Sequence, residues 1–261
     1  LRYEVLEEFC KLYKEKIKIP FMVGGVIPNY VREDKIALLV DAGMNRVRMG
    51  IQSGSQNILD FYKRPTKLHR IKKATEILNK FKKYMIPPSY DIILENPIET
   101  PEDTRATVDM LYEMPRPYTL NIYALRIIPN TTMAKQLKDR GLKVPPIDKN
   151  YFIDYQRTLG NCLVFTLTFW KMPQWLYKFL RKKVYPVQTE QSHYPILFWF
   201  CRGGYLVKRA FDHIRFMDFS ILPGKPGFFL WKLGIIKFWQ RFVLKRYHLP
   251  KKVKEIIQIE R

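Results

Sequence analysis

The sequence predicts an α/β fold with a parallel β-sheet in its first 145 residues. Two observations favour it. Apolar residues recur with the helical and the strand period in turn, and helices of ten or more residues separate the strands. Strands connected in this way pair in parallel through right-handed crossovers. We count four such units, which is half of an eight-unit barrel or a piece of an open sheet.

The individual elements follow from local signals. Gly43 lies where a left-handed helix C-cap belongs. Pro65 breaks a long helical stretch, and Thr66 can cap its second part, while Thr100 and Asp103 form a capping-box pattern. We expect strands at residues 19–26, 46–51, 90–94 and 118–127, and helices at residues 1–16, 32–42, 56–83, from 100 onward and at 132–140.

The character of the chain changes at Val144-Pro145-Pro146. All five tryptophans and 25 of the 38 aromatic residues follow residue 150. Prolines separate short helical segments there, expected at residues 174–183, 196–211 and 228–247. The sequence therefore predicts one domain at residues 1–143 and a mostly helical, basic, aromatic-rich region at residues 144–261.

The net charge of +22 is uneven along the chain. Residues 1–150 carry 26 basic and 18 acidic groups, and residues 151–261 carry 20 and 6, which gives +8 and +14. A field of this sign attracts nucleic acid, anionic lipid or phosphorylated substrates, and a solvated basic surface is the alternative.

Composition excludes several classes of protein. The hydrophobic share of 47% excludes bulk disorder, and the longest uncharged apolar stretch, Leu159 to Trp170, is shorter than the ~18 residues of a bilayer span. Cys10, Cys162 and Cys201 lie far apart without metal spacing, and we expect buried thiols in a reducing compartment. The four histidines show no metal spacing either.

The strongest chemical signal is the run Met49 to Ser55 at the end of a predicted strand. Ligands bind at the carboxyl edge of parallel sheets. Gly50 and Gly54 would let a ligand approach the backbone, and Gln52 and Ser53 offer polar groups ahead of a helix N-terminus. The alternative is a tight turn with Ser55 as a helix cap.

Two further strand ends carry polar residues. Asp91 to Thr100 contains Glu95 and Glu99, whose carboxyl groups could serve in acid–base chemistry or simply shape a strand-to-helix turn. Leu125 to Thr131 follows the last predicted strand, and its Arg126 is a candidate for holding an anion or for a structural ion pair.

In this order, the segments resemble the radical S-adenosylmethionine (radical SAM) superfamily, and most closely its cobalamin-binding branch, over roughly residues 1–142. The matching runs are "IPFMVGGVIPNYV", "LLVDAGMNRVRMGIQSGS", "ILDFYKR", "YDIILENPIETPED" and "LNIYALRIIPNTTMAKQLKDRGL". The resemblance implies the C-terminal part of a partial (β/α)6 TIM-like barrel. It also implies a [4Fe–4S] cluster, S-adenosylmethionine and, from the branch, cobalamin as cofactors.

The resemblance also implies three pairs of S-adenosylmethionine contacts. They are Gln52 and Ser53 at the ribose or methionyl end, Leu94 and Glu95 near the adenine, and Ile127 and Ile128 beside it. Many family members have glycine where Glu95 stands.

The cluster loop C-x-x-x-C-x-x-C of the family has no match in this chain. We expect a chain truncated upstream, which would not cleave S-adenosylmethionine by itself. A degenerate member that has lost its cluster is the alternative.

The run Phe228 to Phe242 mixes Trp and Phe with Lys and Arg, which suits a membrane-interface helix or a helix that packs on the barrel. We expect a cytoplasmic enzyme, peripheral to the inner membrane surface if that helix binds lipid, which performs methylation or radical rearrangement of a small-molecule or lipid-linked substrate. The alternatives are an RNA-modifying member of the superfamily and a non-catalytic membrane-surface binding protein.

Overall fold

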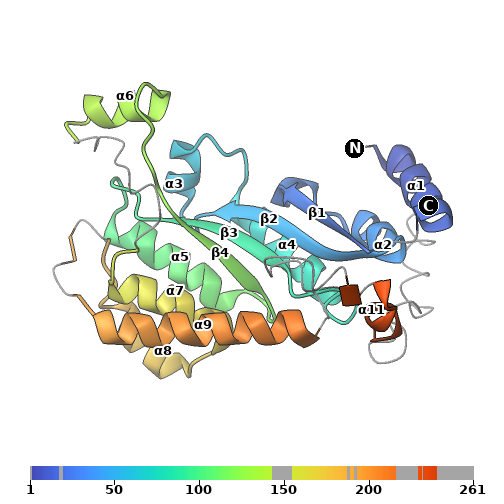
Figure 1. The fold of residues 1–261 in the computed structure, drawn as a ribbon. Coiled ribbons are helices and arrows are strands. Elements are labelled where there is room, and N and C mark those ends of the chain that lie inside the picture. Colours follow the sequence, from blue (N-terminus) through green and yellow to red (C-terminus); the bar gives the residue numbers. More distant parts are fainter. Residues whose placement is uncertain are drawn as a thin grey trace.

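A computed structural model describes residues 2–17, 20–142, 155–186, 189–190, 193–215, 229–230 and 232–239. Four parallel strands lie in the order β1-β2-β3-β4, which confirms the predicted α/β class (Figure 1). The elements are α1 (Tyr3–Leu12), a π-helical turn (Tyr13–Ile17), β1 (Phe21–Val26), a 3-10 turn (Pro28–Tyr30), α2 (Glu33–Asp41), β2 (Met44–Gln52), α3 (Gln56–Phe61), α4 (Leu68–Lys80), β3 (Ser89–Leu94), α5 (Pro101–Glu113), β4 (Thr119–Ala124), α6 (Thr132–Asp139), α7 (Leu159–Phe169), α8 (Gln174–Arg181), α9 (Pro195–Arg215) and α11 (Ile235–Phe238).

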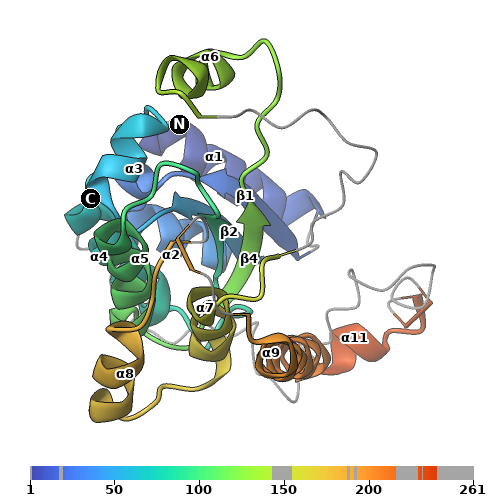
Figure 2. The ribbon, with the colours of Figure 1, turned by 90° about the vertical axis from the view of Figure 1, so that its left-hand side faces the viewer.

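The sheet has one face covered by helices. Val47, Met49 and Ile51 alternate along β2 and are completely buried with side chains of α2, α4 and α5. Figure 2 shows these three helices on the same side of the sheet. Sequential strand order with helices on one side is the arrangement of a TIM-like barrel wall, so the other face of the sheet is the concave one.

Two local predictions at helix starts have different outcomes. The capping box of α5 is confirmed: Thr100 Oγ1 accepts from Asp103 N at 3.2 Å, and Thr100 N donates to Asp103 Oδ2 at 2.9 Å. The prediction that Thr66 caps α4 is wrong, since Lys67 is the N-cap and makes no side-chain cap bond. Thr66 is buried instead, and its carbonyl accepts from Gln56 Nε2.

Helices that follow residue 155 share the core of the sheet. Side chains of α7 and α9, among them Phe165 and Phe198, belong to the same buried cluster as those of β2, β3 and β4. Helix α7 was not predicted, and α9 is longer than expected. The division of the chain at residues 143/144 into two domains stays a prediction.

Side chains from this region bind the outer edge of β4. The carbonyls of Tyr118, Leu120 and Ile122 lie two residues apart and point to the edge away from β3. Lys208 Nζ donates to the first at 3.1 Å, Tyr205 OH donates to the second at 2.5 Å, and Tyr155 OH donates to the third. Groups that would otherwise pair with a further strand are therefore satisfied within the chain.

We expect Tyr205→Phe to lower the free energy of unfolding by about 1–2 kcal/mol, because the buried Leu120 carbonyl loses its donor and Arg209 loses an acceptor. Urea unfolding measures the change. Tyr30→Phe is the control, since Tyr30 is 72% exposed and its variant should stay within about 0.5 kcal/mol of the wild type. Equal effects of the two variants would show that the edge bond contributes nothing.

Two expectations concern the end of the chain and the membrane. Within the described residues, the predicted helix at 228–247 is helical at residues 229, 230 and 232 and over Ile235–Phe238, with a turn at residues 233 and 234. Residues 228, 231 and 240–247 lie outside the described part. None of the helices described here combines the length and the apolar character that a bilayer crossing requires.

Candidate functional site at the carboxyl edge of the sheet

The ends of β2, β3 and β4 lie side by side. In the sheet, Gln52 is opposite Ile92, and Leu94 is opposite Ala124. The three connections that leave this edge are residues 53–55, 95–100 and 125–131, so the segments singled out by sequence meet at one edge.

Gln52 ends β2 in a left-handed conformation with φ 75°, which is rare for a residue other than glycine. Its side chain folds back over the Gly50 backbone: a Cβ at Gly50 would lie 2.7 Å from Gln52 Nε2. Gln52 is 7% exposed. A larger residue at position 50 would therefore make the flexible Gln52 side chain move, and its amide can act as both donor and acceptor at this edge.

The neighbouring turn packs against helix α5. The Ser53 hydroxyl is buried, 3.2 Å from Thr107 Oγ1, and accepts from Ser55 N at 3.1 Å. A Cβ at Gly54 would lie 2.5 Å from the Ala106 carbonyl oxygen. The backbone of α5 therefore occupies the side where a Cβ would lie, so the close packing of this helix requires glycine here. That Gly54 also lets a ligand approach the backbone stays a prediction.

The alternative interpretation of Ser55 is confirmed. Its hydroxyl accepts from Ile58 N at 3.4 Å and so caps α3, and it donates to Asp103 Oδ1. These bonds, with those from Thr100, hold the pKa of Asp103 below its usual value in spite of burial, which acts in the opposite direction. The loop is a structural junction of two helix starts. A contact between Ser53 and S-adenosylmethionine stays a prediction, and the whole residue, backbone included, is buried.

Leu94 and Glu95 follow each other at the end of β3 but face different surroundings. The Leu94 side chain is in the core, and its carbonyl accepts from Leu125 N at 2.8 Å. Glu95 has φ 64°, a conformation that favours glycine, and its Oε1 accepts from Gln156 N at 2.7 Å and from Asn161 Nδ2 at 3.0 Å. The carboxylate therefore connects the sheet edge to the start of α7.

The predicted strand 118–127 is too long, since β4 ends at Ala124. The physical reason is that β3 leaves the sheet at Glu95, so residues after Ala124 have no neighbouring strand to pair with. Ile127 and Ile128 lie in the connection to α6, where Ile128 is half-exposed and its carbonyl accepts from Thr131 Oγ1 at 2.7 Å. They lie near the edge but not on a strand.

Among the carboxyl groups at this edge with a shifted pKa, Glu99 has the largest shift. It is buried behind the turn in which Glu99 N donates to the Asn96 carbonyl at 3.1 Å. Burial, followed by the charges of Asp103 and Glu95, raises its pKa to about 8. Glu99 is therefore protonated in the folded protein at neutral pH.

The concave face carries a polar network that sequence inspection missed. Arg48 Nε donates to Asp91 Oδ1 at 2.8 Å, and an Arg48 guanidinium nitrogen donates to Tyr123 OH at 2.5 Å. Asn121 Nδ2 donates to Asp91 Oδ1 at 2.8 Å and to Ser89 Oγ at 2.9 Å. The sequence does carry a signal for this network. A parallel strand that is buried on both faces is apolar at nearly every position, whereas polar residues alternate with apolar ones in "MNRVRMGIQ" and "SYDIIL".

A cavity of roughly 250 Å³ lies at the other end of this face, between the sheet and α9. Arg46, Arg48 and Arg209 line it together with His213, whose Nδ1 is 3.4 Å from an Arg46 guanidinium nitrogen. Burial, then the charges of Arg46 and Arg209, lower the pKa of His213 to about 4, so its imidazole is neutral at physiological pH.

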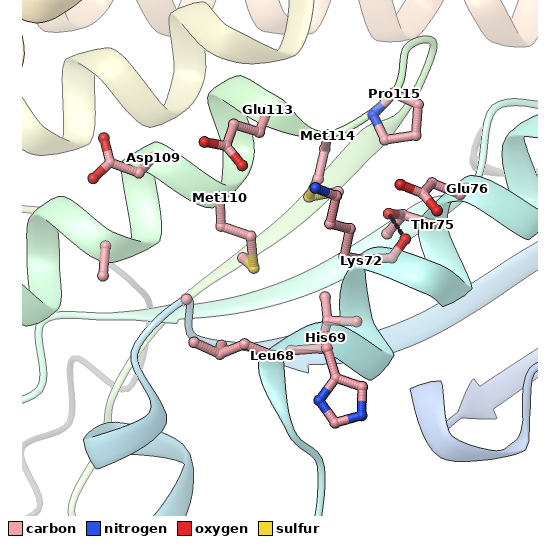
Figure 3. Close-up of a pocket in the computed structure, with 13 residues that line it drawn as sticks. Leu68, His69, Lys72, Thr75, Glu76, Asp109, Met110, Glu113, Met114 and Pro115 are labelled. Carbon is pink, nitrogen blue, oxygen red and sulfur yellow. Dashed lines mark hydrogen bonds between the residues drawn. The ribbon is translucent and has the colours of Figure 1, made fainter.

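A second cavity, of roughly 350 Å³, lies on the helix-covered side between α4 and α5. Figure 3 shows Met110 of α5 and Met114, which follows this helix, facing Leu68 and Lys72 of α4 across it. None of the six predicted site residues lines this groove, but Gly54 from the connection after β2 does, so the groove reaches the carboxyl edge from the helix-covered side.

The decisive comparison is with protein families. The sequence profile of the radical SAM superfamily matches residues 1–111, from the start of the chain to Leu111 in α5. Over residues 1–111 the chain is similar to the radical SAM superfamily. This segment contains β1, β2 and β3 with the connections that carry Gln52 and Glu95.

Several solved structures are similar to this chain. The coproporphyrinogen III oxidase HemN from Escherichia coli, a radical SAM enzyme, is 19% identical with a TM-score of 0.45, and 56% of this chain and 34% of that one are covered. The radical S-adenosylmethionine methyltransferase TsrM from Kitasatospora setae, solved with cobalamin and a [4Fe–4S] cluster, is 20% identical with a TM-score of 0.44, and 55% and 29% are covered.

The archaeal Elp3 from Methanocaldococcus infernus is 23% identical with a TM-score of 0.41, and 65% of this chain and 37% of that one are covered. This chain therefore spans about a third of the length of these three structures. A comparison with curated proteins finds no match.

The cysteines of the chain do not fit the [4Fe–4S] cluster of the radical SAM superfamily. Cys10 is in α1 in a small cluster of its own, while Cys162 and Cys201 are in the main core on α7 and α9. All three are buried free thiols, as predicted. Burial raises the pKa of Cys10 to about 11, which disfavours the thiolate that metal binding needs. No group of three or more potential metal ligands occurs within the described ranges.

Proposed function

We propose that the protein is a radical SAM enzyme in which this chain supplies the sheet edge that binds S-adenosylmethionine. The observation that carries the proposal is the family match over residues 1–111, because it covers the strands whose ends hold Gln52 and Glu95. Both residues adopt the left-handed conformation at the ends of adjacent strands, where a ligand meets the exposed backbone of a parallel sheet.

The proposed activity is the reductive cleavage of S-adenosylmethionine, coupled to methylation or radical rearrangement of a small-molecule or lipid-linked substrate. The cluster that this chemistry requires has to be held by residues other than Cys10, Cys162 and Cys201. We therefore expect these 261 residues alone to bind S-adenosylmethionine but not to cleave it. Cobalamin as a further cofactor stays a proposal from the sequence resemblance.

This chain's own residues then position the ligands. The Gln52 amide offers a hydrogen-bond donor and acceptor beside the Gly50 backbone. On the concave face, Asp91 and Tyr123 hold the guanidinium of Arg48 in a fixed orientation. A side chain that is held by its neighbours can orient a polar substrate without paying for its own ordering. We assign Arg48 to substrate positioning on this basis.

Binding of radiolabelled S-adenosylmethionine, measured by equilibrium dialysis, tests the proposed site. We expect Gln52→Gly to weaken binding by roughly tenfold, the equivalent of one or two lost hydrogen bonds. Glycine suits the left-handed backbone at this position, so the fold should keep a stability within about 1 kcal/mol of the wild type.

Lys63→Gly is the matched control. Lys63 is an exposed residue two positions after the end of α3, and it also has a positive φ, of 53°. Glycine there changes the same backbone property outside the carboxyl edge. We expect its binding to equal that of the wild type. Absence of saturable binding to the wild-type chain, or equal binding by Gln52→Gly, would contradict the proposed site.

A further inference from the structure

Helix α9 has two apolar faces, and among the described residues only one of them is buried. Phe198, Cys201 and Tyr205 are buried against α7 and the sheet. With 3.6 residues per turn, the side chains on the opposite side of the helix lie about 180° away from these three. Those side chains are the outer face of α9, and they consist of Ile196, Trp199, Phe200, Gly203, Leu206, Val207, Ala210, Phe211 and Ile214.

The outer face is exposed and contains no charged or polar side chain. Ile196 is 87% exposed and Phe200 is 77% exposed. The other large members are each more than half exposed, namely Trp199, Leu206, Val207, Phe211 and Ile214. A continuous apolar strip along a helix of 21 residues, about 30 Å long, is not an ordinary water-facing surface and marks an interaction site.

Cations border the strip. Arg202 lies along one side of the outer face and Arg215 along the other, while Lys208 and Arg209 bind the Tyr118 carbonyl and the Tyr205 hydroxyl nearer the core. The Arg202 guanidinium carbon is 5.2 Å from the centre of the Trp199 ring, so a cation is held directly beside an apolar residue of the strip. An apolar strip with cations at its border is typical of a surface that enters a lipid interface.

Helix α8 adds a second element of the same chemistry. Trp175 is 72% exposed and Phe179 is exposed beside it, with Lys178, Lys182 and Lys183 exposed around them. Lys183 Nζ is 4.4 Å from the centre of the Phe179 ring. Figures 1 and 2 both place α8 and α9 along the side of the molecule that is opposite α6.

We propose that the outer face of α9 docks on an anionic lipid bilayer, with α8 on the same side of the molecule. Charge favours this occupant: residues 151–261 carry a net charge of +14, which a negatively charged membrane attracts. The same charge on two copies would repel, which disfavours a homodimer through this face. RNA would satisfy the cations and leave seven large apolar side chains in water. The proposal is independent of S-adenosylmethionine binding.

Co-sedimentation with vesicles of phosphatidylcholine containing 30% phosphatidylglycerol tests the proposal. We expect the wild-type chain to bind, and the binding to weaken in 0.5 M salt and on vesicles of phosphatidylcholine alone. The double variant Phe200→Ser/Phe211→Ser should bind at least tenfold more weakly, because each substitution removes the apolar surface of a phenyl ring from the contact with lipid. Both side chains point away from the core, so unfolding curves should be unchanged.

The control variant is Val5→Ser/Tyr30→Ser, which removes two exposed apolar side chains from α1 and the turn after β1. It should bind vesicles like the wild type. Lys182→Gln/Lys183→Gln should weaken binding to anionic vesicles and leave binding to neutral ones unchanged. Three results would overturn the proposal: no vesicle binding by the wild type, equal binding by Phe200→Ser/Phe211→Ser, or a dimer in light scattering that this variant abolishes.

Discussion

Replacing Gly54 with alanine is expected to destabilise the protein by at least about 3 kcal/mol. The new Cβ would lie 2.5 Å from the Ala106 carbonyl oxygen and 2.6 Å from the Thr107 Cα, and both are backbone atoms that cannot move aside without displacing α5. Helix α5 is fixed at its start by the Thr100 capping box and by Ser55. Urea unfolding followed by circular dichroism measures the loss.

Gly203→Ala is the matched control for that substitution. Nothing lies within 4 Å of a Cβ built at Gly203, which is in the middle of α9. Alanine there should stabilise the protein by about 0.5–1 kcal/mol, because glycine is the poorer helix former. A Gly54→Ala variant as stable as the wild type would show that the turn after β2 can move away from α5.

Replacing Glu99 with glutamine is expected to change how stability depends on pH. The folded state holds the Glu99 proton up to about pH 8, while the unfolded chain releases it near the ordinary value of 4.5. The folded state therefore binds more protons between these two values, and its stability falls as the pH rises through this window. Glutamine removes the titration and keeps the shape of the neutral carboxyl group. At pH 8 the variant should be more stable than the wild type by roughly 4 kcal/mol.

The measurement is the free energy of unfolding in urea at pH 5, 6.5 and 8. The difference between wild type and Glu99→Gln should be smallest at pH 5 and largest at pH 8. Glu102→Gln serves as the control, because the Glu102 side chain is 78% exposed on the first turn of the same helix. Parallel curves for the wild type and Glu99→Gln would mean that Glu99 ionises at an ordinary pH in the folded protein.

The predicted fold is confirmed because its signals are local. Apolar alternation in β2, the left-handed Gly43 after α2 and the capping box of α5 each depend on residues close in sequence. Helix α7 was missed for the opposite reason. Nine of its residues are buried, so it is apolar around its whole circumference and shows no helical periodicity.

The site was only partly predictable, and the reason is also physical. Sequence placed Gln52 and Glu95 at strand ends, and the structure brings these ends to one edge. Sequence could not show that Gly54 contacts α5 or that Glu95 binds residues 61 and 66 positions away. Such long-range contacts depend on packing, which no local pattern records. Binding of S-adenosylmethionine by the six residues stays a prediction.

The donors that line β4 have a consequence for how the chain folds. Tyr155, Tyr205 and Lys208 all come from residues that follow the sheet in sequence, so the outer edge of β4 stays open until α9 has docked. An open strand edge pairs readily with the same edge of another molecule. A nascent chain, or a chain cut before residue 155, therefore has an open β4 edge that can pair with another molecule and so aggregate. In the 261-residue chain, side chains of Tyr155, Tyr205 and Lys208 cover this edge.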